Sequence, residues 1–141
     1  MDHLRAWVDW GVLGALGAAS VVALAVAIER WRYIARIDAA AYASRVRLEA
    51  DLTTRLGWLS TIAANAPYLG LLGTVLGIML TFEGLGAGGG LDARTIMSGL
   101  ALALKATAAG IAVAIPCVAA NNALRRRVRE RLADFDEARG G

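Results

Sequence analysis

Side chains that carry redox, metal or nucleophilic chemistry are scarce in this sequence of 141 residues. It has one cysteine, Cys117, and one histidine, His3, so it can form neither an internal disulfide nor a catalytic Cys/His pair. It also lacks clusters with metal-ligand spacing and a glycine-rich phosphate loop between a strand and a helix. These absences argue against an enzyme, and we expect no catalytic residue, no metal and no cofactor.

Charge is missing from three long stretches. Uncharged residues run from Trp10 to Ile28 and from Leu56 to Phe82. A third stretch, from Thr95 to Leu124, is interrupted only by Lys105, and none of the three has a carboxylate in its interior. At about 1.5 Å per residue, each can cross a hydrocarbon layer of ~30 Å. With 57% hydrophobic residues, the chain is predicted to be an all-α membrane protein. We expect spans at 10–28, 58–82 and 96–124 within a single domain, 1–141.

Positive charge lies mainly just beyond two of the span ends. The N-terminus has only Arg5 and the loop between the second and third stretches has only Arg94. The positive-inside rule therefore places the linker 29–57 and the tail 125–141 in the cytoplasm, with the N-terminus outside. Cations placed in this way argue against a nucleic-acid partner. The linker and tail arginines are Arg30, Arg32, Arg36, Arg45, Arg47, Arg55, Arg125, Arg126, Arg127, Arg129, Arg131 and Arg139.

Both cytoplasmic segments have apolar residues at helical spacing. Arg45 and Glu49, and likewise Asp51 and Arg55, are one helical turn apart. We expect the second span to begin as a cytoplasmic helix, the third to continue inward, and the two extensions to pack together. Alternatively, both lie on the membrane surface as basic amphipathic helices. The stripes are Leu48, Leu52, Leu56 and Leu59 in the linker, and Leu124, Val128, Leu132 and Phe135 in the tail.

Small residues and threonines share one face on each of the last two spans, and such a face can meet either another helix or an opening. A single membrane threonine commonly bonds the carbonyl one turn back. However, Thr74 lies about 28 Å beyond Arg55 and Thr107 about 27 Å before Arg125 if both helices are straight, which predicts a common depth. The two lanes are Gly70, Thr74, Gly77 and Thr81, and Ala103, Thr107, Gly110 and Ala114.

Two prolines and one lysine interrupt these spans. Pro67 and Pro116 each remove a backbone hydrogen bond and permit a kink, which allows a gating role. Lys105 places a charge inside a span, at a cost of about 2.5 to 3.5 kcal/mol on insertion scales. It points about 200° away from Thr107 around the helix. Lys105 either reaches the outer interface or pairs with an acid, namely Glu83, Asp92 or a carboxylate on another chain.

The segments APYLGLLGTVLGIMLTF at 66–82 and GLALALKATAAGIAVAIP at 99–116 resemble the two signature helices of the MotA/TolQ/ExbB proton-channel family. The short chain is most similar to the compact ExbB form of that family, and the first span and basic linker agree in position. One departure is Leu102, which stands where some longer members have a glutamate. The role of that glutamate cannot be transferred.

The resemblance implies a ring of five subunits in the bacterial inner membrane, whose second and third helices line a central pore. It implies a single-span ExbD-type partner whose aspartate carries the proton, and a TonB-type force transducer. It assigns Thr74 and Thr107 to the pore lining, with the other members of the two lanes around them. Two alternatives stay open: a TolQ-like energiser of envelope constriction, and a structural membrane scaffold without ion flux. A self-contained transporter would need a buried acid of its own.

Overall fold

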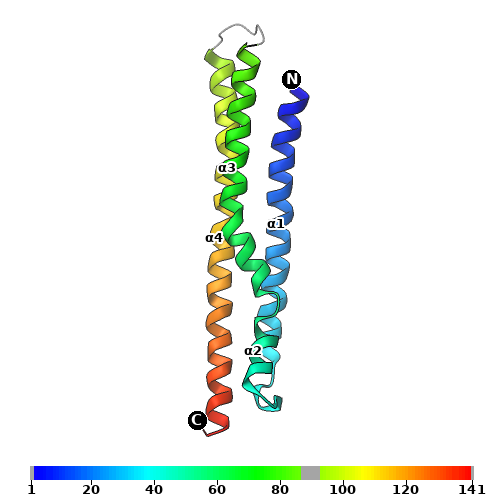
Figure 1. Cartoon of the computed structure of the whole chain (residues 1–141), viewed down its shortest axis with the longest axis vertical. Coiled ribbons are helices and arrows are strands. Elements are labelled where there is room, and N and C mark those ends of the chain that lie inside the picture. The colour runs from blue at the N-terminus through cyan, green and yellow to red at the C-terminus, as the bar shows by residue number, and fades with distance from the viewer. Residues whose placement is uncertain (1, 87–92, 141) are drawn as a thin grey trace.

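The computed structural model describes residues 2–86 and 93–140, and within these ranges the chain is helical without strands. Its helices are α1 (Asp2–Arg36), α2 (Arg45–Thr53), α3 (Leu56–Gly86) and α4 (Ala93–Ala138), with a short 3-10 helix at Ala39–Ala41. Within the described ranges, three segments are long and apolar enough to cross a membrane: Trp10–Arg36, Leu56–Gly84 and Ile96–Ala138. The predicted all-α fold with three candidate spans is confirmed. Figure 1 shows an elongated bundle in which α4 runs along the whole length and the two termini lie at opposite ends.

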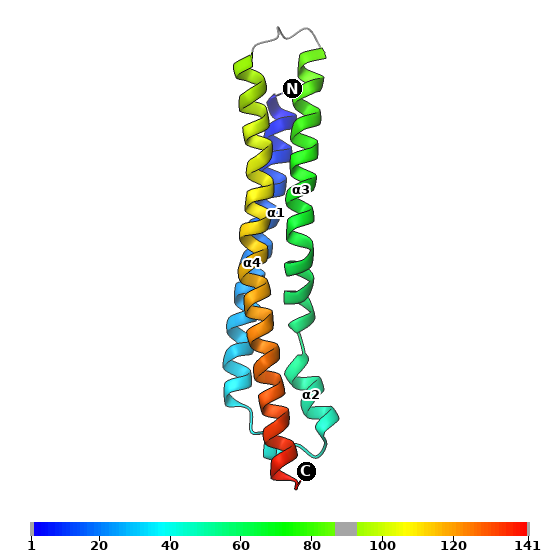
Figure 2. The same ribbon diagram turned by 90° about the vertical axis from the view of Figure 1, so that its left-hand side faces the viewer.

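The two predicted leucine-rich stripes pack against each other at the arginine-rich end of the bundle. Leu48, Leu52 and Leu59 are fully buried, and Leu124 is 1% exposed. Both stripes belong to one core cluster, which α1 completes with Ala23 and Ile34. The prediction that the linker and tail extensions pack together is confirmed, and the alternative of separate surface helices is wrong. Figure 2 shows α2 lying beside the C-terminal half of α4.

The predicted continuous helix from the linker into the second span is wrong. The helix breaks after Thr53 and restarts at Leu56, and Arg55 has a positive φ of 66°. The break also separates Asp51 from Arg55, which were expected to pair. Arg55 instead pairs with Glu29 on α1 at 2.6 Å, while Asp51 accepts a hydrogen bond from the Tyr42 hydroxyl at 2.8 Å.

Arg30 on α1 caps the broken end of α2. A helix leaves its last carbonyls without helical donors, and the guanidinium of Arg30 donates to the carbonyl oxygens of Asp51 and Leu52. Arg30 is only 4% exposed and also lies over the ring of Tyr33, 4.3 Å from its centroid. Two consecutive α1 residues, Glu29 and Arg30, therefore hold the α2–α3 break in place.

Arg131 in α4 and Arg139, just beyond the end of α4, perform the same task for the end of α1 and the linker. Arg131 donates to the carbonyls of Ile34 and Ala35 at the end of α1, at 3.2 and 3.3 Å. Arg139 donates to the carbonyls of Ala43 and Tyr42, at 3.1 and 2.6 Å. Several of the arginines that predict the membrane orientation therefore also donate hydrogen bonds to backbone carbonyls at helix ends and in the linker.

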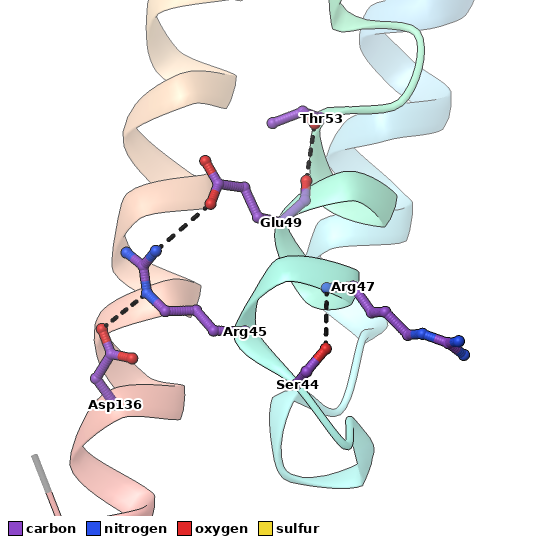
Figure 3. A network of polar contacts seen from close by, with 6 residues as sticks. All are labelled: Ser44, Arg45, Arg47, Glu49, Thr53 and Asp136. Carbon is purple, nitrogen blue, oxygen red and sulfur yellow. Dashed lines mark hydrogen bonds and ion pairs between the residues drawn. The ribbon is translucent and has the colours of Figure 1, made fainter.

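Side-chain contacts add a further link between α2 and α4. Ser44 caps α2 by accepting a hydrogen bond from the backbone N–H of Arg47. Arg45 pairs with Glu49 at 3.4 Å, as its spacing predicts, and also with Asp136 on α4 at 3.2 Å (Figure 3). Hydrogen bonds to Tyr33 and, to a lesser extent, to Asp51 raise the pKa of the Tyr42 phenol above its ordinary value.

Small residues replace the leucine core where α3 and α4 run through the apolar part of the bundle. A Cβ atom on Gly70 would lie 2.6 Å from the carbonyl oxygen of Ala106, and one on Gly110 would lie 2.5 Å from that of Ala66. A Cβ on Gly77 would lie 2.8 Å from the Cβ of Ala103. These distances leave no space for a methyl group, so glycine is what allows the two backbones to touch. We call this contact the glycine seam.

Both prolines lie inside helices that continue on either side of them, Pro67 in α3 and Pro116 in α4. The missing backbone donors do not end either helix. A gating role for either proline stays a prediction.

Replacing Gly70 by alanine should destabilise the bundle. Gly→Ala in a helix interior normally stabilises by about 1 kcal/mol, but at Gly70 the new methyl group must separate α3 from α4, at a cost of roughly 1 to 3 kcal/mol. Thermal unfolding in detergent measures the difference. Gly14→Ala is the matched control, because a Cβ there meets nothing within 4 Å. Equal melting temperatures for the two variants would contradict the seam.

Replacing Arg30 by methionine should lower the free energy of unfolding by about 2 kcal/mol, since it leaves the α2 carbonyls without a charged donor. Arg32→Met is the control: Arg32 is exposed, and the described ranges give its side chain no hydrogen bond. Chemical denaturation in detergent measures both. An Arg30 variant as stable as the Arg32 variant would show that the cap contributes nothing.

Candidate functional site

Thr74 on α3 and Thr107 on α4 meet within the glycine seam. Their hydroxyl oxygens are hydrogen-bonded to each other. Thr74 is 9% exposed, whereas Thr107 is partly exposed. The prediction that the two threonines lie at one depth is confirmed, because antiparallel helices in direct contact bring residues 74 and 107 opposite each other.

Backbone carbonyls complete the hydrogen bonding of this threonine pair. Thr74 Oγ1 lies 3.1 Å from the carbonyl oxygen of Ala103 and 3.3 Å from that of Gly70. Thr107 Oγ1 also lies 3.3 Å from the Gly70 carbonyl oxygen. Two hydroxyls supply two O–H donors. One O–H group donates to the other threonine, and the second O–H group donates to a backbone carbonyl. The pair therefore has no donor left, but its oxygen lone pairs can still accept a hydrogen bond.

The other lane residues lie in the same region. Thr81 is 2% exposed and donates to the carbonyl of Gly77 at 2.8 Å, one turn back. Ala103 is 1% exposed, and Ala114 belongs to a small cluster with Leu16 of α1. The structure thus brings the two lanes together as the α3–α4 contact within one chain. Their predicted role in lining a pore stays a prediction.

On α4, the predicted lane missed two members of the contact. Gly99 lies against Thr81, whose Oγ1 would be 2.5 Å from a Cβ placed there, and Ala106 lies against Gly70 and Gly73. The series 99, 103, 106 and 110 follows helical spacing as well as the predicted lane does. The predicted lane on α4 was the one that contains the hydroxyl of Thr107. The face of α4 that contacts α3 is centred to one side of that lane, on the side of Ala106.

A groove of about 390 Å³ opens beside the seam, toward the α3–α4 loop. Lys105 stands at its edge with Ser98 and Leu102, and it is exposed. Among the residues the structure describes, Lys105 forms no ion pair, and Asp92, one of its predicted partners, lies outside them. The described ranges also contain no group of three or more His, Cys, Asp or Glu residues that could hold a metal ion.

The arrangement therefore brings together two hydroxyls that can accept hydrogen bonds, on an apolar scaffold. Asp9 and Glu29, at the two ends of the first uncharged stretch, and Glu83, directly after the second, are the acidic residues nearest to these stretches along the chain. A hydroxyl does not ionise near neutral pH, so it can orient a proton carrier but cannot be one.

Comparison with known proteins connects this site to a family. The model of the MotA/TolQ/ExbB proton channel family matches residues 32–137. The chain is 49% identical over 140 residues to a biopolymer transport protein ExbB from Aquifex aeolicus, covering 99% of this chain and 95% of the relative. It is 52% identical over 127 residues to an ExbB protein from Helicobacter pylori, covering 90% and 88%.

A more distant similarity extends to a Tol-Pal system protein TolQ from Pseudomonas aeruginosa, which is 43% identical over 81 residues, covering 57% of this chain and 35% of TolQ. Three described helices that are long and apolar enough to cross a membrane, together with these relatives, make the chain a multi-pass membrane protein, and the inner membrane is the location consistent with the family. The family model spans most of the chain and an ExbB relative spans nearly all of it, and the chain belongs to the MotA/TolQ/ExbB proton channel family.

Proposed function

We propose that this chain is the ring-forming subunit of an inner-membrane proton channel that converts the proton gradient into mechanical work for energised outer-membrane uptake. The observation that carries the proposal is the threonine pair, whose donors are used and whose lone pairs remain. In this proposal an ExbD-type partner helix supplies an aspartate, and a TonB-type protein transmits the force outward. ExbB relatives about half identical to this chain support the assignment.

The threonine pair would favour the protonated form of the partner's acid. A protonated carboxyl offers one O–H donor, and the lone pairs of Thr107 can accept it, whereas an ionised carboxylate needs donors that the pair no longer has. Hydrogen bonding to the neutral form raises the pKa of a carboxyl group. Thr107 is the member positioned to make this contact, because it is partly exposed while Thr74 is buried.

The proposed assembly is a ring, most simply of five copies, with Thr107 turned toward a central passage. The chain then acts as one domain with its N-terminus outside, and with the linker 29–57 and tail 125–141 in the cytoplasm. The glycine seam would keep each α3–α4 pair rigid, so that movement takes place between the ring and the partner helices. The leucine core and the arginine caps would anchor the ring on the cytoplasmic side.

A TolQ-like role in envelope constriction is the second candidate, supported by the TolQ relative that matches 57% of this chain. The same ring and threonine pair would serve either system, so the co-purified partner separates them. A scaffold without ion flux differs more sharply, because it predicts no transport defect when the threonines are changed.

Thr107→Val should reduce pH-driven proton flux by up to about tenfold, since one hydrogen bond to a neutral carboxyl group contributes roughly 0.5 to 1.5 kcal/mol. Flux is measured in vesicles containing this chain and its partner. Thr107→Ser keeps the hydroxyl and should retain most of the flux, and Thr61→Val, on an exposed threonine, should leave it unchanged. Normal flux through an assembled Thr107→Val ring would remove the threonine pair from the mechanism.

The orientation is tested with reporter fusions. Green fluorescent protein fused after Arg139 should fluoresce, because it folds in the cytoplasm, and alkaline phosphatase inserted in the loop between α3 and α4 should be active, because it matures outside. The arginine asymmetry supplies the physical reason. The reverse pair of results would overturn the proposed orientation.

A further inference from the structure

Lys105 carries a charge that the described part of the chain does not neutralise. It is exposed within an apolar segment, and no ion pair reaches it there. An unpaired ammonium within a span costs about 2.5 to 3.5 kcal/mol on insertion scales. A carboxylate beside it would offset that cost. Glu83, on α3, is the acidic residue on this side of the bundle whose side chain the structure describes, and it is also exposed without an ion pair in the described ranges.

Glu83 of the same chain is not oriented to pair with Lys105. Ala103 and Thr81 lie in the glycine seam, 1% and 2% exposed. Lys105 and Glu83 each follow one of these residues by two positions, which turns each about 200° around its helix. The Lys105 side chain therefore starts on the flank of α4 that is turned away from the seam, and it reaches the edge of the groove whose α3 side is formed by Gly77, Leu80 and Thr81. Glu83 starts on the flank of α3 that is turned away from α4. The two groups lie on opposite outer sides of the α3–α4 pair.

Along the bundle axis, the side chains of Lys105 and Glu83 nevertheless tilt toward the same level. A Cβ on Gly77 would touch Ala103, and one on Gly99 would touch Thr81. Gly77 is therefore level with Ala103, and Thr81 with Gly99. Because the two helices are antiparallel, Glu83 is level with residue 97. Lys105 lies eight residues further along α4, about 12 Å away in height. Side chains tilt toward the N-terminus of their helix, and α3 and α4 are antiparallel. Lys105, which lines the groove with Ser98 and Leu102, and Glu83 therefore tilt toward each other in height.

The surfaces around the two charges differ in a complementary way. The α4 face with Lys105 also carries Ala101, Ala108 and Ala112, all exposed, and is therefore shallow. The α3 face with Glu83 carries large exposed side chains, among them Tyr68, Leu72 and Met79, which are 69%, 50% and 60% exposed. Large side chains of one helix fit against small ones of another when helices pack in a membrane.

We propose that Lys105 forms an ion pair with Glu83 of a neighbouring copy of this chain, across a contact between α4 of one copy and α3 of the next. The inference rests on the proposed ring. In a ring with its axis along the membrane normal, equivalent residues of all copies lie at one height, so the register within one chain also holds between neighbours. Every copy donates one lysine to one neighbour and one glutamate to the other, which is the head-to-tail contact that closes a ring.

Charge reversal tests the pair in the full chain. Lys105→Glu and Glu83→Lys should each raise the dissociation constant of the oligomer about tenfold, because each places like charges together, and the double variant should return to within about threefold of the unaltered chain. Oligomer mass and its dissociation are measured in detergent. Lys105→Met, which removes the charge and nearly keeps the length, should weaken the oligomer less than Lys105→Glu.

Cross-linking shows whether the pair joins two copies. Two differently tagged chains are co-expressed in a Cys117→Ala background, which removes the single native cysteine. One carries Glu83→Cys and the other Lys105→Cys. A bismaleimide should yield a dimer that contains both tags, and Ile111→Cys in place of Lys105→Cys should not. Absence of the mixed dimer would overturn the proposal.

The remaining outcomes are equally decisive. An unaltered chain that is monomeric overturns the proposed ring and this pair together. An intact ring in which the double reversal does not restore stability overturns the pair alone. The pair is also overturned if Lys105→Glu is rescued by Asp9→Lys, at the acid directly before the first uncharged stretch, and not by Glu83→Lys. Reversals that leave the oligomer unchanged but abolish stabilisation by vesicles containing anionic lipid would assign Lys105 to a lipid phosphate and overturn the ion pair.

Discussion

Direct contact between the backbones of α3 and α4 is the constraint on which the rest of this structure depends. Gly70 and Gly110 each face a carbonyl oxygen at a distance that excludes any side chain. Helices in lipid gain no hydrophobic stabilisation by associating, so close packing and hydrogen bonds must hold them together. Once the seam is fixed, Thr74 and Thr107 must meet, because they lie at one height in two touching antiparallel helices.

The bundle solves two different packing problems along its length. Where α3 and α4 are most apolar, small residues bring the backbones together. At the arginine-rich end, a core of leucines from α2, α3 and α4 provides apolar burial of the kind that stabilises soluble proteins. The change from glycine to leucine follows the change from uncharged to arginine-rich sequence along the bundle. The leucine core is also why α2, which is too short and too polar to cross a membrane, still belongs to the bundle.

Arginines reinforce the leucine-rich end of the bundle. Arg30, Arg131 and Arg139 donate to backbone carbonyls at helix ends and in the linker, and a guanidinium can serve two carbonyls at once because its donors form a planar fork. The arginines, whose placement predicts the orientation of a membrane protein, thus also hold the linker to the rest of the bundle.

The threonine pair has the opposite character. Its hydroxyl donors are already used, so it can only accept a hydrogen bond from another molecule.

The sequence by itself determined the helical fold, the three candidate spans, the two stripes that pack together and the common depth of Thr74 and Thr107. These follow from periodicity and length, which are local properties. Tertiary contact decided the rest. The break at Arg55 could not be predicted, because the leucine spacing continues through it and the contacts from Glu29 and Arg30 that stabilise it come from another helix. Ala106 and Gly99 were missed because several small-residue lanes on one helix have the same spacing, and only the neighbouring helix selects which of them is buried.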